Sequence, residues 1–287
     1  MTLRGVTMIM KAMDSDWNRI EQDRYKYQDY QYPTVSVVIP CYNHSAKIAL
    51  TLDSILGQNY PKFEILVIDA GSSDRTLEVV KNYRDERVHV YSVSGYKRYE
   101  MLNKGVSQAS GSYVNCLFPG DFYIYPDALL YIMETALDND LPDLVYCGTL
   151  LRDGRTDPKI LYREMSLKLL RIGQQPTSLQ SCWFKTETIR QIGKFDVHYK
   201  LRGGFELMCR FLARSNLRVI STRRVLTDYD LRHVTRPMVM NHFIETLTTI
   251  KQYFGFRAMV RWLFIQKDFK RLLKIWWRQV KIAFIGP

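Results

Sequence analysis

The sequence lacks several features that would assign it to a common functional class. Its five cysteines include no Cys-x-x-Cys pair, and its five histidines have no metal-ligand spacing. No stretch reaches the roughly 20 apolar residues of a membrane-spanning helix. Gly-x-Ser-x-Gly, Walker A and Gly-x-Gly-x-x-Gly patterns are also missing. A disulfide framework, a zinc centre, a membrane span and the familiar nucleophile and phosphate-loop motifs are therefore not expected.

The amino-terminal stretch, MTLRGVTMIMKAM, lacks the long apolar segment and small-residue cleavage site of a signal peptide. Several cysteines stand in apolar runs, where a free thiol behaves as a small hydrophobic group. Both features favour a reducing, cytoplasmic setting. Residues 14–32 are polar and rich in Tyr and Gln without an apolar period, so we predict a flexible leader over residues 1–32.

The chain does contain enough apolar material for one large core, because 46% of its 287 residues are hydrophobic and 13% are aromatic. This composition excludes collagenous, coiled-coil and wholly disordered chains. The formal charge is +12, from 41 Lys and Arg against 29 Asp and Glu. A charge of this size suggests a phosphate-bearing partner, either nucleic acid or an anionic membrane surface.

Most of this charge lies near the carboxyl terminus. Residues 251–287 hold nine Lys or Arg and one Asp and so carry +8, which leaves +4 for the rest. Drawn as a helix, the end of this segment has a basic side and an opposite side with Trp276, Trp277 and Phe284. We therefore predict that residues 256–287 form a basic amphipathic helix peripheral to the inner face of the cell membrane. The alternative is a terminal helix that docks its apolar side on the domain, and a nucleic-acid partner is disfavoured.

From residue 34 onward, short β-branched runs alternate with helical patterns. The runs 34–40, 63–69, 88–93 and 112–118 predict strands, and apolar residues at helical spacing between them predict helices. This alternation predicts an α/β fold, a mostly parallel sheet flanked by helices, with ligands beyond the carboxyl ends of the strands. Later patterns predict helices at 126–137, about 205–215 and 240–254, a strand at 143–150 and a buried segment at 178–184.

Four polar segments are predicted to project to one edge of this sheet: PCYN (40–43), DAGSSD (69–74), PGD (119–121) and GGFE (203–206). Asp69 stands between a strand and a Gly turn, which suits hydrogen bonds from a base or a ribose. The alternative is an Asp that caps the next turn, and for a lone Asp-x-Gly this alternative is favoured. Asp121 suits Mg²⁺ or Mn²⁺ with help from the phosphates of a ligand, although a turn residue in Pro-Gly-Asp is an equal alternative.

The order and spacing of longer motifs resemble glycosyltransferase family 2, the inverting group with the Rossmann-like GT-A fold, over roughly residues 33–255. The motifs are VSVVIPCYN, FEILVIDAGSSDRT, MLNKGVSQASGSYVNCLFPGD, FKTETIRQIGKFD and GGFELMCRFL. Each is weak alone, so their joint order carries the resemblance. The NKG and PGD variants, with the later ETLTTIKQYFG, look closest to the branch that builds bacterial exopolysaccharide and colanic-acid-type capsules.

The resemblance implies a nucleotide-diphosphate-sugar donor. Asp121 would match the last acid of the family's metal-binding Asp-x-Asp motif, and Mg²⁺ or Mn²⁺ there would neutralise the diphosphate leaving group. Asn103 and Gly105 would match the Asn-x-Gly helix that closes the donor pocket. The residues that the resemblance assigns to the donor are Pro40, Tyr42, Asn43, Asp69, Gly71, Asn103 and Gly120.

One departure from the family concerns the catalytic base. The family's base is an Asp at the head of a helix, and aligning that helix on Leu207 and Arg210 puts Gly204 at the base position. An inverting transfer needs a carboxylate to take the proton of the acceptor hydroxyl, which glycine cannot do. Three alternatives follow: Glu206 reaches the acceptor hydroxyl, another acidic residue acts as the base, or the enzyme is impaired. Glu206 also suits a second interpretation, as a helix N-terminal carboxylate favoured by the helix dipole.

We therefore expect a glycosyltransferase domain at residues 33–255, with a nucleotide-sugar half at 33–126 and an acceptor half at 127–255. It would move a sugar to a carbohydrate or lipid-linked acceptor, with inversion, in surface polysaccharide or glycan synthesis. Glu206 is the candidate base. The alternative is a catalytically impaired relative that binds nucleotide sugars or partner enzymes at a membrane.

Overall fold

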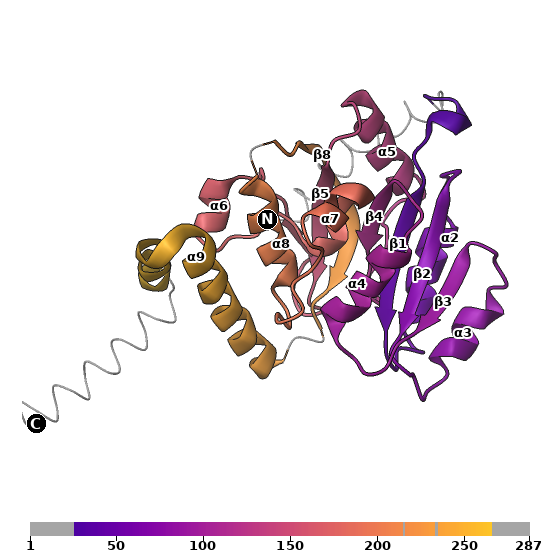
Figure 1. The fold of residues 1–287 in the computed structure, drawn as a ribbon. Coiled ribbons are helices and arrows are strands. Elements are labelled where there is room, and N and C mark those ends of the chain that lie inside the picture. The colour runs from indigo at the N-terminus through magenta and orange to yellow at the C-terminus, as the bar shows by residue number, and fades with distance from the viewer. Residues whose placement is uncertain (1–25, 215, 233–234, 266–287) are drawn as a thin grey trace, which may run out of the picture.

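The computed structural model describes residues 26–214, 216–232 and 235–265, which form one mixed sheet with helices on both faces (Figure 1). The strands are β1 (Val35–Cys41), β2 (Phe63–Asp69), β3 (Val88–Ser92), β4 (Tyr113–Cys116), β5 (Leu144–Arg152), β6 (Lys159–Leu161), β7 (Cys182–Lys185) and β8 (Val219–Asp230). The helices are α2 (Ile48–Leu56), α3 (Thr76–Asn82), α4 (Arg98–Gln108), α5 (Ala128–Asp138), α6 (Leu167–Arg171), α7 (Thr186–Gln191), α8 (Gly203–Leu212) and α9 (Arg236–Ile265). Short 3₁₀ turns, η1 (Asp29–Gln31) and η2 (Leu179–Ser181), complete the order.

The strand order is β3-β2-β1-β4-β7-β5-β6, and β8 pairs with β5. Strands β1 to β4 are parallel, in the register that places Cys41 beside Asp69. Strand β7 runs antiparallel to both β4 and β5. The predicted α/β fold with a mostly parallel sheet is therefore confirmed. Because parallel strands end together, the segments after β1, β2 and β4 meet at one edge of the sheet.

Alternate residues of β1 and β2 face opposite layers, which is why both runs are largely apolar, with Ser36 and Glu64 as polar residues near their starts. Val37 and Ile65 belong to the core cluster that includes residues of α2 and α5, whereas Val38 and Leu66 pack with residues of α4 and α8. Gly105 allows the second layer to close, because a Cβ there would lie 2.2 Å from the Val38 side chain. The core thus holds α4 directly against the central strand that precedes the site.

Part of the predicted flexible leader contacts α5, through Lys26, Tyr27 and Tyr32. Tyr32 is 2% exposed, and its hydroxyl donates a hydrogen bond to Glu134 at 3.0 Å. Lys26 pairs with Asp138 at 2.5 Å. Aromatic rings in a polar segment thus bury their faces while their hydroxyls reach carboxylates. Residues 1–25 of the predicted leader lie outside the described residues.

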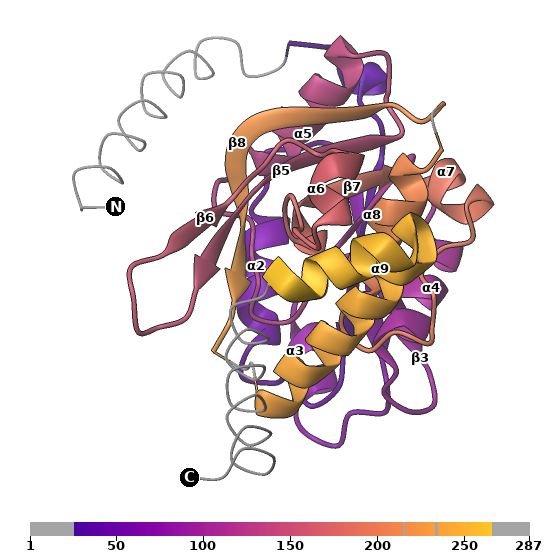
Figure 2. The same ribbon diagram turned by 90° about the vertical axis from the view of Figure 1, so that its left-hand side faces the viewer.

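Helix α9 changes direction at Gly255, whose φ of 81° breaks the helical path, and Figure 2 shows its two halves crossing at an angle. Ala258 and Trp262 of the second half are buried against Ile250 of the first. This part of the predicted carboxyl-terminal helix docks on the domain by one side. Residues 266–287 lie outside the described residues. None of the described helices combines the length and the apolar character required to span a bilayer.

Candidate active site

A first pocket of about 160 Å³ lies at the carboxyl ends of β1 and β4, and we call it the Asp121 pocket. Pro40 from the end of β1 and Asp121 from the loop after β4 both line it, as the sequence predicts. Lys47 before α2, Arg98 at the start of α4 and Tyr229 of β8 complete its charged and aromatic wall. Segments far apart in sequence therefore converge here because the parallel strands end at the same edge.

Asp121 is the acid at the centre of this pocket. Its side chain is 2% exposed and accepts hydrogen bonds from Gln180 Nε2 at 2.7 Å and from the backbone N–H of Asp230 at 3.0 Å. Burial raises the pKa of Asp121 to about 7, and the nearby Asp228 and Asp230 also raise it. The positive φ of Gly120, 101°, sets the turn that directs Asp121 inward.

The two neighbouring acids differ from Asp121 because each has a cationic partner. Asp228 forms a two-point ion pair with Arg152. Asp230 is bonded by Arg232 and lies 3.7 Å from Lys47 Nζ, so its pKa falls well below the usual range, chiefly through the hydrogen bond from Arg232. Asp121 has no ion pair within the described residues. It is therefore the carboxylate whose negative charge remains open to a bound cation.

The donor set fits a divalent ion held by one protein carboxylate. No group of three His, Cys, Asp or Glu side chains is arranged for a metal within residues 26–214, 216–232 and 235–265. Mg²⁺ and Mn²⁺ are commonly held by one or two carboxylates, with water and substrate phosphates as the other ligands. Asp121 is buried, oxygen-bearing and without a cation of its own, so it suits that role.

The loops after β1 and β2 are hydrogen-bonded to each other, and they contain residues that the family resemblance assigns to the donor. Asp69 is 1% exposed and accepts from the backbone N–H groups of Gly71 and Ser72 at 3.0 and 2.9 Å. The amide oxygen of Asn43 accepts from the N–H of Ser73 at 2.9 Å. In this structure Asp69 caps its own turn and Asn43 positions the two loops. Their contact with a nucleoside stays a prediction.

A tyrosine of the Asp121 pocket, Tyr96, pairs with a second exposed tyrosine, Tyr42. The rings of Tyr42 and Tyr96 lie 6.0 Å apart at an angle of 35°, and their side chains are 41% and 44% exposed. Exposed aromatic faces beside a polar pocket offer a stacking surface for a planar base.

The side-chain amide of Asn103 on α4 is hydrogen-bonded to the protein backbone. Its amide pairs with the backbone of Phe195, donating to the carbonyl at 2.8 Å and accepting from the N–H at 2.9 Å. It does not line the Asp121 pocket among the described residues. In this structure Asn103 ties α4 to the loop before α8, and its expected role in closing the donor pocket stays a prediction.

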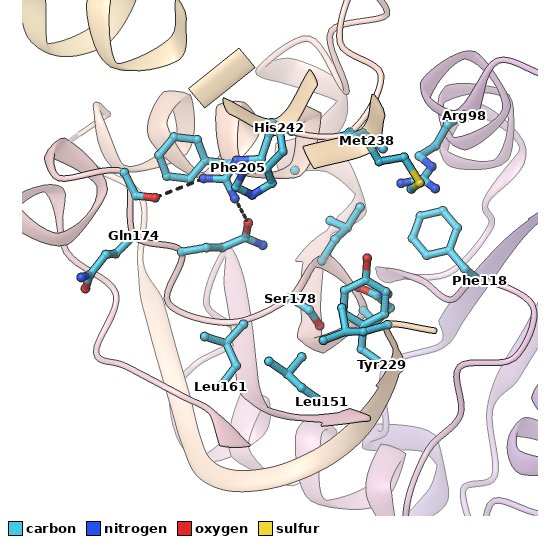
Figure 3. Close-up of a pocket in the computed structure, with 18 of the residues that line it drawn as sticks. Arg98, Phe118, Leu151, Leu161, Gln174, Ser178, Phe205, Tyr229, Met238 and His242 are labelled. Atoms are coloured by element: carbon cyan, nitrogen blue, oxygen red, sulfur yellow. Dashed lines mark hydrogen bonds between the residues drawn. The ribbon is translucent and has the colours of Figure 1, made fainter. Parts of the chain in front are cut away.

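A second pocket of about 510 Å³ adjoins the first, and we call it the Arg202 pocket. Arg98, Phe118 and Tyr229 line both pockets, so the two cavities share a wall. Figure 3 shows Arg98 and Phe118 together at one end of the Arg202 pocket and Gln174 at the other. Gly204, which the family resemblance is expected to place at the base position, is part of its lining.

Glu206, the predicted base, lines neither pocket among the described residues, and its role as base stays a prediction. Its carboxylate is 2% exposed and is held at two points by Arg210, with distances of 3.0 and 2.8 Å. The Tyr253 hydroxyl of α9 donates a further bond at 2.5 Å. Oε2 is thus occupied by Arg210 of the same helix, and Oε1 is shared between Arg210 and Tyr253, which joins α8 to α9. The Glu-x-x-x-Arg spacing on a helix is the sequence signal from which this ion pair could have been predicted.

We expect the substitution Glu206→Gln to lower stability without removing turnover. Breaking a buried, two-point ion pair leaves Arg210 partly uncompensated, so the free energy of unfolding should fall by about 3 kcal/mol. Thermal unfolding, with the exposed Glu187→Gln as the matched control, measures this change. A variant of unchanged stability that has lost turnover per folded molecule would support Glu206 as the base.

Sequence reasoning did not find the cations of this site or the strand β8. Lys47, Arg98 and Arg202 come from separate segments, and no local motif marks them. Strand β8 contributes Tyr229, and the alternation in VLTDYD was the available signal for it. The adjacent Arg-Arg pair and the absence of turn residues concealed that pattern.

Comparison with known proteins adds a family to this geometry. The family model described as "Glycosyl transferase family 2" matches residues 36–202, more than half of the chain. An uncharacterized glycosyltransferase of Rickettsia typhi is 28% identical over 199 residues, which are 66% of this chain and 62% of that protein. A poly-beta-1,6-N-acetyl-D-glucosamine synthase of Staphylococcus epidermidis is 35% identical over 111 residues, 38% of this chain and 27% of that enzyme. The chain spans less than two thirds of the length of these curated relatives.

Two solved structures share the architecture at low sequence identity. S. aureus TarS, in complex with UDP, has a TM-score of 0.60 at 19% identity, covering 77% of this chain and 66% of that one. The mannosyltransferase PcManGT from Pyrobaculum calidifontis, in complex with GDP-Man and Mn²⁺, has a TM-score of 0.57 at 16% identity, covering 90% and 83%. At these identities the likeness concerns the fold.

Proposed function

Because the chain belongs to glycosyltransferase family 2 and has the GT-A fold, we propose that it transfers a sugar from a nucleotide-diphosphate-sugar donor to a carbohydrate or lipid-linked acceptor, with inversion. The observation that carries the proposal is the buried Asp121 carboxylate, which has no cationic partner among the described residues and faces a pocket with Lys47 and Arg98. Such an arrangement suits a diphosphate with a divalent ion.

The donor would enter with its base at the Tyr42 and Tyr96 pair and its diphosphate beside Lys47 and Arg98. Glycosyl transfer pushes negative charge onto the departing diphosphate, and cations already in place stabilise that charge without reorganising. Asp121 would hold Mg²⁺ or Mn²⁺, which supplies further positive charge to the same leaving group. Gln180, bonded to Asp121, keeps the carboxylate in one orientation.

The Arg202 pocket would receive the acceptor, because it adjoins the donor pocket along the wall of Arg98, Phe118 and Tyr229. An acceptor bound there would approach the sugar from the side opposite the leaving diphosphate, the direction of attack that inversion requires. The alternative, a relative that binds nucleotide sugars without turnover, is supported by the glycine at the base position.

The donor proposal is tested by incubating the full chain with UDP-GlcNAc, GDP-mannose and related donors, with Mn²⁺ or with EDTA. Donor binding is read by thermal unfolding and turnover by release of the nucleoside diphosphate. We expect at least one donor to raise the unfolding temperature only with the metal present. Absence of any such shift across the panel would remove the proposed function, whereas binding without release would favour the non-catalytic alternative.

We also propose a role in surface polysaccharide or glycan synthesis, supported by the local likeness to a poly-beta-1,6-N-acetyl-D-glucosamine synthase. A peripheral position at the inner face of the cell membrane is supported by α9, where Phe256, Phe264 and Ile265 are 65%, 55% and 50% exposed. Arg257 and Arg261 are exposed on the same half of the helix. Exposed rings beside cations suit an anionic interface.

The membrane proposal predicts that the full chain sediments with vesicles containing phosphatidylglycerol and not with phosphatidylcholine vesicles. The double variant Phe256→Asp/Phe264→Asp should reduce the bound fraction several-fold, because charge opposes insertion at an anionic surface. Ile160→Asp, at an exposed apolar position on β6, is the matched control. If the unchanged chain, the double variant and Ile160→Asp bound the vesicles equally, membrane attachment through this half of α9 would be refuted.

A further inference from the structure

The Arg202 pocket carries charge of a single sign. Three guanidinium groups line it, those of Arg98, Arg163 and Arg202, and no Asp or Glu is among its described lining residues. Two carboxylates nearby are committed elsewhere. Glu206 pairs with Arg210, and Glu245 accepts from the backbone N–H groups before α8, including that of Arg202 at 2.7 Å. A pocket of this kind favours a negatively charged ligand.

Arg202 itself is a buried cation with neutral partners. It is 5% exposed, donates to Gln175 Oε1 at 2.6 Å and to the carbonyl of Gly173 at 3.3 Å, and stacks on Phe205 at 3.9 Å. Its Nε–H has no hydrogen-bond partner, and no ion pair involving Arg202 occurs among the described residues. Burial lowers the pKa of Arg202 to about 10, so it remains charged near neutrality. A buried charge of this kind is costly unless a ligand compensates it.

The described residues that line the Arg202 pocket offer no effective proton acceptor for a hydroxyl. Gly204 replaces the carboxylate of the family, and burial raises the pKa of Tyr99 to about 12, which keeps that phenol protonated. Desolvation and the charge of Arg202 lower the pKa of His242 to about 4, so this imidazole is a weak base. An acceptor hydroxyl would therefore lose its proton slowly here.

The remaining wall is apolar. Leu151, Leu161, Leu179, Leu231, Met238 and Val239 line the pocket, and Figure 3 shows Leu151 and Leu161 side by side below Ser178. Flexible aliphatic side chains of this type contact hydrocarbon better than they contact the hydroxyl-rich face of a sugar. The ligand should thus combine an anionic head with an apolar chain.

We propose that the acceptor is a lipid phosphate monoester whose phosphate oxygen is the nucleophile. The assignment rests on the proposed function. A phosphate monoester is already ionised near neutral pH, so its attack on the anomeric carbon needs no general base. The new bond joins the phosphate oxygen to the anomeric carbon, and the bond from that carbon to the donor diphosphate breaks with its electron pair. No proton moves, and the charge lost by the attacking oxygen appears on the departing nucleoside diphosphate.

Three probes separate the parts of this proposal: farnesyl phosphate, farnesol and inorganic phosphate, titrated calorimetrically into the full chain without donor. We expect farnesyl phosphate to bind at least about tenfold more tightly than either other probe, because charged hydrogen bonds and apolar contact act together. If farnesol bound as tightly as farnesyl phosphate, the anionic head would not contribute to recognition. If inorganic phosphate bound as tightly, the lipid chain would not contribute. Either result would overturn the proposal.

Two variants connect the affinity to the guanidinium groups. Arg202→Gln and the surface variant Arg163→Gln should each weaken farnesyl phosphate about tenfold, whereas Arg155→Gln, an exposed cation that lines neither pocket, should not. Arg163→Gln keeps the test valid if the buried substitution unfolds the chain. An unchanged affinity in Arg163→Gln, and in Arg202→Gln if folded, would overturn the assignment.

The transfer itself is followed by mass spectrometry of lipid extracts, with a donor that the chain binds. Farnesyl phosphosugar should accumulate and farnesyl glycoside should not. Glycosylated farnesol as the main product would overturn the inference while leaving the proposed function intact. Failure of all donors to bind would refute the proposed function, and the acceptor role with it. The calorimetric titration would then still show whether the Arg202 pocket binds a lipid phosphate.

Discussion

Asp121→Asn should lower sugar transfer by about 10²- to 10³-fold, because it removes the carboxylate that we propose to hold a divalent ion beside the leaving diphosphate. The amide keeps the size of the side chain and can still pair with Gln180. The buried charge disappears, so the unfolding temperature should not fall. Initial rates of nucleoside diphosphate release, at several Mn²⁺ concentrations, measure the effect.

Asp143→Asn is a matched control for this experiment. Asp143 accepts hydrogen bonds from Thr188 and Arg218 and lines neither pocket. It should keep the wild-type response to Mn²⁺ even if the chain loses some stability. Full turnover in Asp121→Asn, with the same metal response, would show that the ion binds elsewhere or is not used.

Gly204→Asp should lower transfer to farnesyl phosphate by about 10²-fold, because a carboxylate placed among the three guanidinium groups repels an anionic acceptor and neutralises the charge that attracts it. This result runs against the usual expectation for the family. If the acceptor were a hydroxyl, restoring a carboxylate at the base position should raise the rate by about 10²- to 10⁴-fold. The sign of the change therefore distinguishes the two chemistries.

Gly204→Asn controls for the added volume. A Cβ at this position would lie 3.3 Å from the Leu179 Cβ, so either side chain displaces that leucine slightly. The asparagine variant should lose only a small part of the rate, because it adds the bulk without the charge. Comparable losses in both variants would indicate a steric effect and would leave the charge argument unsupported.

The fold could be predicted largely from local patterns. The runs TVSVVIP and FEILVID are mostly apolar because both faces of β1 and β2 are covered, and a short, mostly apolar run rich in β-branched residues predicts a buried strand. Strand β8 was missed because its first half, with the pair Arg223 and Arg224, interrupts the apolar pattern. Its position beside β5 depends on tertiary pairing that no local pattern shows.

The site was predictable only in part, for a physical reason. The position of Asp121 follows from the rule that parallel strands end at one edge. The direction of the Glu206 side chain depends on α9, whose Tyr253 lies 47 positions later and completes the bonding of that carboxylate. The guanidinium groups of the Arg202 pocket likewise come from segments around residues 98, 163 and 202, which only the folded chain brings together.

The central claim is that the Asp121 pocket binds a nucleoside diphosphate through a divalent ion. Calorimetric titration of the full chain with UDP and with GDP, in Mn²⁺ and then in EDTA, tests it most directly. We predict that at least one of the two binds about tenfold or more tightly with Mn²⁺, and that Asp121→Asn abolishes this difference. Binding that ignores both the metal and Asp121, or no binding of either diphosphate, would contradict the claim.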